Sequence, residues 1–156
     1  MFQFLKKKTD FNLYAPIKGK CIDIAEVKDK VFASKVMGDG FAVIPDDNVI
    51  CSPCEGVITM IFPSKHAFGI KMKDGKEILI HIGIDTVQLN GNGFVSFKQV
   101  NEHVKIGEPV IQFDKINIES QNYDLTTMVI VTNQSNSMKK QKLGEMVEVK
   151  DLIVSY

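Results

Sequence analysis

Two of the three histidines in this chain of 156 residues lie close together in sequence, at positions 66 and 81. Paired imidazoles can bind a metal ion, act as general bases, or form a nucleophile and its helper, and they can also be purely structural. Asp74-Gly75 lies between His66 and His81 and joins two runs of apolar and β-branched residues. Asp-Gly at such a junction is a strong hairpin signal, because both turn residues need a positive φ. The sequence therefore predicts one β-hairpin that carries both histidines.

A two-residue turn would fix which residues of this hairpin face each other. In that register Phe68 lies opposite His81, and His66 lies opposite Gly83. His66 and His81 are then diagonal neighbours on one face of the sheet, with about 7–8 Å between their backbones. We expect an apolar dish around the two imidazoles, with a polar rim at its far end. The residues expected in the dish and at its rim are Phe68, Ile70, Leu79, Ser64 and Asp85.

The sequence around the histidines favours some chemistries over others. Zinc usually takes three or four protein ligands, and no His-x-His or His-Glu-x-x-His spacing supplies them. A hydrolytic triad would need Ser64 as nucleophile, but Ser64 is not part of a Gly-x-Ser-x-Gly motif. Neither a phosphate-binding loop nor a dinucleotide fingerprint is present. A neutral imidazole keeps a free nitrogen lone pair near pH 7, so the pair suits phosphoryl transfer to histidine without a metal or other cofactor.

Composition narrows the class of protein. Lysine and arginine total 19, as do aspartate and glutamate, and this balance argues against a nucleic-acid binder. No apolar run has the length of a signal peptide or a membrane span, so a cytoplasmic protein is expected. Residues 1–8 are basic but too short for strong lipid binding, and at most peripheral membrane association is expected. We interpret residues 1–12 as a flexible tail.

Three cysteines and the third histidine receive no catalytic role from the sequence. An odd cysteine count without an export signal fits reduced thiols at Cys21, Cys51 and Cys54. Cys51 and Cys54 have redox or metal spacing, but no second pair accompanies them and no helix signal follows. His103 is expected to be structural or exposed to solvent.

The pattern along the chain predicts an all-β protein in one domain of residues 1–156. Short alternating segments are separated by Gly, Asp, Asn and Pro, and only residues 29–37 and 116–121 indicate a helical turn or two. Two pairs of similar segments, 15–19 with 52–56 and 104–110 with 142–147, indicate a β-sandwich with an internal pseudo-repeat. The predicted strands are 20–24, 40–44, 56–62, 67–72, 77–84, 109–113, 128–132 and 145–149.

Several motifs follow one another in a fixed order between residues 15 and 133. They include Phe62-Pro63-Ser64-Lys65-His66-Ala67, Leu79-Ile80-His81-Ile82-Gly83-Ile84-Asp85-Thr86-Val87 and Leu89-Asn90-Gly91-Asn92-Gly93-Phe94. In these motifs the chain resembles the glucose-type enzyme IIA domain of the bacterial phosphoenolpyruvate-dependent sugar phosphotransferase system. The resemblance implies an antiparallel β-sandwich that takes a phosphoryl group from phospho-HPr and passes it to the IIB domain of a sugar permease.

The resemblance also implies roles for particular residues. His81 would be phosphorylated on Nε2, and His66 would hold the phosphoryl group. Ser64 stands where the family usually has threonine, so a hydroxyl is retained. The family docks HPr on an apolar collar with acidic residues that receive an arginine. By position, the collar would be Val31, Phe32, Val36, Met37, Phe62, Leu79 and Val87, with Asp29 and Asp85 as arginine acceptors.

Two positions depart from the family pattern, and two other functions stay open. Lys30 stands where the family is commonly apolar or proline, and Asp124 replaces the usual serine at the start of the segment 124–130. No role is carried over to that segment.

One alternative function is a regulatory binding protein of the same fold, whose phosphorylation state controls transporters or enzymes. The other is a zinc hydrolase on a related β fold.

Overall fold

The fold is described from a computed structural model that places residues 10–134 and 137–156. The expected flexible tail, residues 1–12, therefore lies outside the described residues except for its last three. Of these, Phe11 is half-buried and packs against the main hydrophobic core. The described chain begins its first strand directly afterwards, at Leu13.

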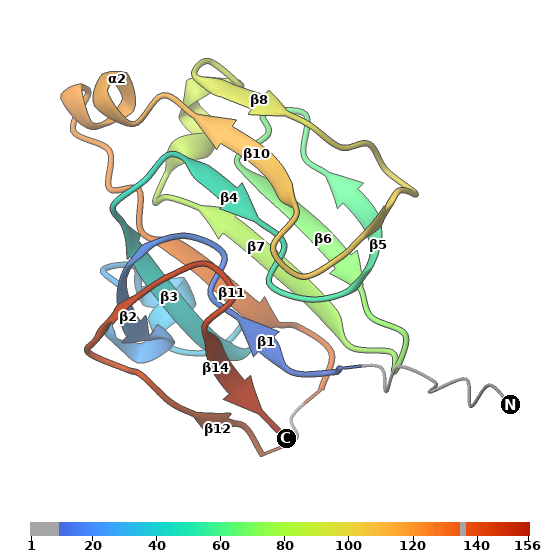
Figure 1. The fold of residues 1–156 in the computed structure, drawn as a ribbon. Coiled ribbons are helices and arrows are strands. Elements are labelled where there is room, and N and C mark those ends of the chain that lie inside the picture. The colour runs from blue at the N-terminus through green and yellow to red at the C-terminus, as the bar shows by residue number, and fades with distance from the viewer. Residues whose placement is uncertain (1–9, 135–136) are drawn as a thin grey trace, which may run out of the picture.

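Three antiparallel sheets make up the described chain (Figure 1). The large sheet has eight strands in the order β13 (Met146–Val147), β2 (Gly19–Asp23), β3 (Asp39–Pro45), β11 (Thr127–Val131), β7 (Glu77–Ile82), β6 (Ala67–Lys71), β5 (Gly56–Ile61) and β9 (His103–Val104). Two smaller sheets have the orders β4 (Val49–Cys51), β10 (Pro109–Phe113), β8 (Phe94–Ser96) and β1 (Leu13–Tyr14), β14 (Leu152–Ser155), β12 (Lys139–Lys140). The helical segments are η1 (Ile24–Glu26), α1 (Lys30–Ala33), η2 (Thr86–Leu89) and α2 (Lys115–Ser120).

The predicted all-β class is confirmed, and each predicted strand overlaps a strand of the structure. The two predicted helical turns are also present, as α1 and α2. Strands that the sequence did not indicate are β1, β4, β8, β9, β12 and β14, each of two to four residues. Such short segments carry too little alternation to be recognised. Their pairing depends on distant partners, as where Leu13 lies opposite Val154.

The first pair of similar segments occupies corresponding places in the large sheet. Residues 15–19 lead into β2 and residues 52–56 lead into β5. β2 and β5 are each second from an end of the eight-stranded sheet. A similar turn therefore introduces a similar strand at both sides of the sheet, as expected of a pseudo-repeat.

Both faces of the large sheet are buried, and they carry different cores. On β11, Val129 belongs to the main core between the sheets, whereas its neighbours Met128 and Ile130 belong to a smaller cluster on the opposite face. Successive side chains of a strand point to opposite faces, so each central strand contributes to both. The members of the smaller cluster are Ile22, Ile24, Val27, Phe32, Ala42, Ala67, Leu79, Met128 and Ile130, with Phe62 and Ile84 packed against it.

The β6–β7 hairpin forms as predicted, but its turn is one residue longer. The Met72 N–H donates to the Lys76 carbonyl at 2.8 Å, which leaves three residues in the loop. Among them Gly75 has a positive φ of 96°, whereas Asp74 does not, so the turn is not the mirror-image type that a two-residue loop needs. The Asp74 carboxylate also accepts from the Lys76 N–H and from its ammonium group, which holds this loop.

The extra residue changes which side chains share a face. Ala67, and not Phe68, lies opposite His81, and Phe68 lies opposite Ile80. The predicted register was therefore wrong by one residue, and a one-residue slip moves every side chain of a strand to the other face. Phe68 and Ile70, which were expected beside the histidines, lie in the main core. Leu79 lies in the smaller cluster on the side of His81, as expected, and Ala67 takes the place of Phe68 opposite His81.

Candidate functional site

His81 lies near the end of β7, where it is flanked on both sides by buried residues. Its neighbours across the sheet are Ala67 on β6 and Met128 on β11. The phenyl ring of Phe32, on α1, packs over the imidazole with 4.8 Å between ring centroids. The half-buried His81 ring is thus held by the smaller cluster, and its outer edge stays accessible.

A backbone carbonyl fixes the tautomer of His81. Nδ1 lies 2.8 Å from the Gly83 carbonyl oxygen, which can only accept a hydrogen bond. The proton of the neutral ring is therefore on Nδ1, and Nε2 carries the lone pair. Gly83 has a φ of 81°, and a Cβ there would lie 2.5 Å from Cγ2 of Thr86. Only glycine fits this position.

His66 precedes β6 and reaches His81 although the register differs from the one predicted. Its carbonyl accepts from the Ile82 N–H at 2.6 Å, so its backbone is opposite Ile82 and not Gly83. Regular strand geometry begins only at Ala67, because Lys65 has a φ of 55°. The His66 and His81 ring centroids are 5.0 Å apart, with the planes at 80°. The irregular backbone, and not the sheet alternation, brings the two imidazoles together.

Ser64 and Phe62 orient the His66 ring. The Ser64 hydroxyl lies 2.7 Å from His66 Nδ1, and Phe62 packs edge-on at 5.3 Å between centroids. His66 is only 3% exposed. Ser64 therefore contacts His66. The two-residue turn would also place Ser64 opposite Asp85, but the β6–β7 ladder ends at Ala67 and His81, so that pair does not form.

Burial keeps both imidazoles neutral. It lowers the pKa of His66, and burial together with the neighbouring His66 lowers the pKa of His81 from 6.5 to about 4. The bond to the Gly83 carbonyl and the charges of Asp29 and Asp85 act in the opposite direction on the pKa of His81 but are smaller. Both rings are therefore uncharged at pH 7, which is the state in which a ring nitrogen can attack.

Asp29 and Asp85 are the two carboxylates whose charges influence His81. Asp29 caps α1 by accepting from the Val31 N–H at 2.9 Å. Asp85 is exposed and precedes η2 with a φ of 60°. Both carboxylates are close enough to act on His81, as their effect on its pKa shows. They place negative charge at the rim of an otherwise apolar site.

The residues proposed as an apolar collar divide into two groups. Val31, Val36, Met37 and Val87 are exposed, with Val36 at 75%. Phe32 and Leu79 are almost fully buried, and Phe62 is half-buried. The first group exposes apolar side chains at the surface, whereas the second lies in or against the smaller cluster.

A family model describes this chain over residues 11–137, which is most of its length. The family is the phosphoenolpyruvate-dependent sugar phosphotransferase system, EIIA 1. The chain belongs to this EIIA family.

Relatives of this EIIA chain include separate proteins and parts of longer ones. A glucose-specific EIIA component of Haemophilus influenzae is 39% identical over 150 residues, which cover 96% of this chain and 90% of that protein. A glucose-specific EIICBA component of Staphylococcus carnosus is 42% identical over 135 residues, which cover 86% of this chain. The EIIA chain spans only about 20% of the length of that EIICBA protein.

A solved structure has the same fold. The glucose permease IIA from Mycoplasma capricolum superimposes with a TM-score of 0.87 and 37% sequence identity. The match covers 99% of this EIIA chain and 98% of that one. Within the described ranges 10–134 and 137–156, no helix is long and apolar enough to cross a membrane.

Sequence reasoning did not find the groups that position His81. The Gly83 carbonyl accepts its Nδ1–H, and Phe32 covers its ring. The signal for the first was present, because a glycine two residues after a histidine permits a backbone conformation that returns its carbonyl to the ring. Nothing in the sequence indicated Phe32 as a ring contact, since α1 reaches β7 only through the tertiary fold.

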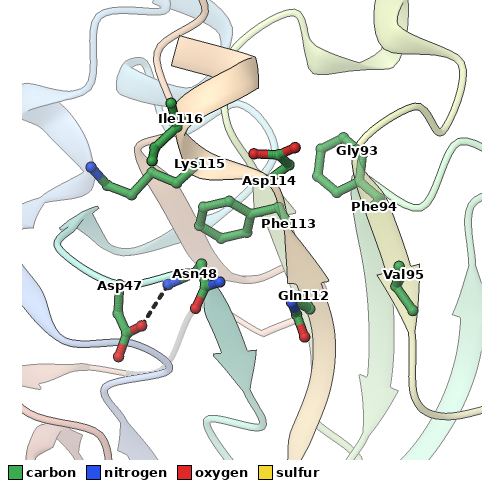
Figure 2. Close-up of a pocket in the computed structure, with 10 residues that line it drawn as sticks. All are labelled: Asp47, Asn48, Gly93, Phe94, Val95, Gln112, Phe113, Asp114, Lys115 and Ile116. Carbon is green, nitrogen blue, oxygen red and sulfur yellow. Dashed lines mark hydrogen bonds between the residues drawn. The ribbon is translucent and has the colours of Figure 1, made fainter. Parts of the chain in front are cut away.

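A cavity beside α2 and the three cysteines are weaker candidates for a functional site than the histidine pair. A cavity of about 600 Å³ opens beside α2 and β8, and Figure 2 shows that its walls hold Asp47, Asp114 and Lys115 but neither histidine nor cysteine. The three cysteines are free and buried, and burial raises the pKa of both Cys21 and Cys54 to about 12. Their thiolates are therefore scarce.

Neither the third histidine nor a cluster of possible metal ligands adds a second site in the described residues. His103 is exposed, as predicted, with Nε2 3.4 Å from Glu55 Oε1. Among the placed residues, no group of three His, Cys, Asp or Glu side chains is arranged to hold a metal ion.

Proposed function

We propose that this EIIA chain is a phosphohistidine carrier. Nε2 of His81 accepts a phosphoryl group from phospho-HPr and passes it to the IIB domain of a glucose-family sugar permease. The observation that carries this proposal is the hydrogen bond from His81 Nδ1 to the Gly83 carbonyl, because it leaves the lone pair on Nε2. Family membership supports the sugar phosphotransferase context.

The transfer needs no proton to move at His81. The bond between the donor and phosphorus breaks as the Nε2 lone pair forms a new nitrogen–phosphorus bond. Nδ1 keeps its proton throughout and continues to donate to the Gly83 carbonyl. Onward transfer to IIB reverses these events and restores the same neutral tautomer. The low pKa of His81 supports this cycle, since a protonated Nε2 could not attack.

His66 supplies a donor to the phosphoryl oxygens. When the Ser64 hydroxyl donates to His66 Nδ1, the proton of the His66 ring is on Nε2. His66 Nε2–H can then donate to the phosphoryl group on the neighbouring ring, which stands in T-shaped contact. A preformed donor in a partly water-free site stabilises charge without reorganisation.

The exposed valines and the acidic rim form the docking surface in this proposal. Val31, Val36 and Val87 expose apolar side chains. Val31 lies on the same short helix as Phe32, whose ring packs on His81. Asp29 and Asp85 would receive an arginine of HPr, because a carboxylate can bind a guanidinium by two parallel hydrogen bonds. We also infer that these transfers occur in the cytoplasm, which three free cysteines support.

The test is a reconstituted transfer with phosphoenolpyruvate, enzyme I and HPr. Phosphate should be mapped by mass spectrometry at neutral to alkaline pH, where phosphohistidine survives, and then chased with a purified IIB domain. We expect label on His81 that requires HPr and leaves when IIB is added. The matched control is His103→Ala, which removes the exposed histidine and should not change the labelling. Absence of label on His81 in the folded protein would overturn the proposal.

A further inference from the structure

We propose that Asp124 is a positioning residue for His81. The family pattern gives no role to this residue. The inference rests on the proposed function, because it concerns how the reacting ring is held. Asp124 is exposed and lies in the segment just before β11, and its carboxylate bonds to Thr126 and not to a histidine. It acts through a series of hydrogen bonds that ends at His81 Nδ1.

The series begins at the Asp124 side chain. Oδ1 of this carboxylate accepts from the Thr126 N–H at 2.8 Å and from the Thr126 hydroxyl at 2.6 Å. Thr126 is only 5% exposed, so both of its donors need a protein acceptor. A carboxylate accepts such bonds more strongly than a neutral oxygen, and its exposure limits the cost of desolvation. The side chain thus closes a tight turn over residues 124–126.

The backbone of that turn holds the segment after His81. The Asp124 carbonyl accepts from the Ile84 N–H at 2.8 Å, and the Thr126 carbonyl accepts from the Gly83 N–H at 3.0 Å. The Gly83 carbonyl in turn accepts from His81 Nδ1 at 2.8 Å. The Asp124 carboxylate, just before β11, is therefore connected to the His81 imidazole through the backbone that follows β7.

The backbone around Gly83 is closely packed. A Cβ on Gly83 would lie 2.9 Å from the Asp124 carbonyl oxygen and closer still to Thr86. The Thr86 hydroxyl also bonds to the Ile82 carbonyl, so the segment is held from its other side. If the turn at Asp124 opens, the N–H groups of Gly83 and Ile84 each lose their acceptor, and the peptide between these two residues can rotate. The Gly83 carbonyl would then no longer enforce the Nδ1–H tautomer.

The experiment compares Asp124→Ala with Asp124→Asn. Alanine removes the acceptor, whereas asparagine keeps an oxygen in the same place without the charge. Nitrogen-15 NMR of the unphosphorylated protein reports the tautomer of His81 directly. For Asp124→Ala we expect the His81 ring resonances to move toward those of a mixture of tautomers. The rate of phosphoryl transfer should fall about tenfold, as for a misaligned reacting group. Asp124→Asn should stay within about twofold of the unaltered protein.

A matched control separates positioning from general destabilisation. Asp114 is also an exposed aspartate, and it caps α2 with a carboxylate that accepts from the Asn117 N–H at 3.2 Å. Asp114→Ala should leave the His81 tautomer unchanged. If Asp124→Ala does not fold, Thr126→Val removes one of the two bonds at an isosteric side chain and should shift the same resonances less.

Three results would overturn the inference. They are unchanged His81 resonances in folded Asp124→Ala, unchanged resonances in folded Thr126→Val, and an Asp124→Asn variant as impaired as Asp124→Ala. The NMR result does not depend on phosphorylation. If the unaltered protein takes no phosphate, the proposed function fails, while the tautomer still tests the role of Asp124.

Discussion

The two ends of the β6–β7 hairpin each bury a basic side chain, but they surround it differently. At the turn, Lys76 is 3% exposed and its ammonium group is bound by the Asp74 carboxylate. The ammonium nitrogen also lies 4.4 Å from the ring centroid of Tyr156 and 5.5 Å from that of Phe11. At the other end, His66 and His81 are packed against phenyl rings and against each other.

One end holds a buried base whose surroundings stabilise a positive charge, and the other holds two bases whose surroundings oppose one. Lys76 has an acidic partner and two aromatic faces, all of which stabilise its positive charge. The histidines have surroundings that oppose a positive charge, so the pKa of each is lowered and a ring nitrogen lone pair is retained. Burial alone therefore does not indicate chemistry. The arrangement of charge and of hydrogen-bond acceptors around the buried group does.

The largest effect that this comparison predicts is at His81. His81→Ala should abolish phosphorylation, because no other side chain at the site offers a free ring nitrogen with the Gly83 carbonyl behind it. The measurement is the incorporation of phosphate from phosphoenolpyruvate through enzyme I and HPr. Residual labelling above that of a reaction without HPr would show that another residue is the acceptor.

The second effect concerns His66. His66→Gln should still accept phosphate on His81 but should pass it to IIB at least about tenfold more slowly, since a positioned donor to the phosphoryl group is altered. Single-turnover chase of the phosphorylated variant with a IIB domain measures this rate. Ser64→Ala provides the comparison, because it leaves the ring in place and removes only the contact to Nδ1. Unimpaired onward transfer by His66→Gln would remove His66 from the mechanism.

The third prediction addresses the opposite end of the hairpin. Lys76→Met should lower the free energy of unfolding by about 2–3 kcal/mol, because the methionine can pack on the rings but leaves Asp74 without its partner. Urea denaturation measures this loss. Transfer by the folded variant should not change. Slower phosphoryl transfer by a fully folded Lys76→Met variant would mean that the two ends of the hairpin are coupled.

The smallest effect is the dependence of stability on pH. The pKa of His81 is about 4 in the folded chain against 6.5 ordinarily, so the unfolded chain binds this proton first as the pH falls. The corresponding stability is present above about pH 6.5 and is lost as the pH falls toward 4. Between pH 7 and pH 5 the free energy of unfolding should fall by about 1–2 kcal/mol more in the unaltered protein than in His81→Gln.

That difference can be measured by urea denaturation at the two pH values, with His103→Gln as the control. His103 is exposed and stands apart from the histidine pair, so this variant controls for the replacement of a histidine as such. Equal losses in the unaltered protein and His81→Gln would mean that His81 is not kept neutral by the fold.

Much of this molecule was recoverable from sequence because the signals are local. Alternating runs predicted the strands of the large sheet, and Asp74-Gly75 predicted the place of the hairpin turn. The motifs around His66 and His81 indicated the family, which the comparisons confirm. The short strands escaped prediction, because a segment such as β1 becomes a strand only when β14 pairs with it.

Local patterns along the chain predicted the class of fold and pointed to the two histidines. The register of the hairpin depends instead on contacts between distant parts of the chain. Asp74, together with the rings of Phe11 and Tyr156 from opposite ends of the chain, holds Lys76 at the end of a three-residue loop. Because strand side chains alternate with a period of two, that one residue reassigned the faces of the hairpin. The irregular backbone before β6 brings the imidazoles together. The Gly83 carbonyl holds the proton of His81 on Nδ1, which leaves the lone pair on Nε2.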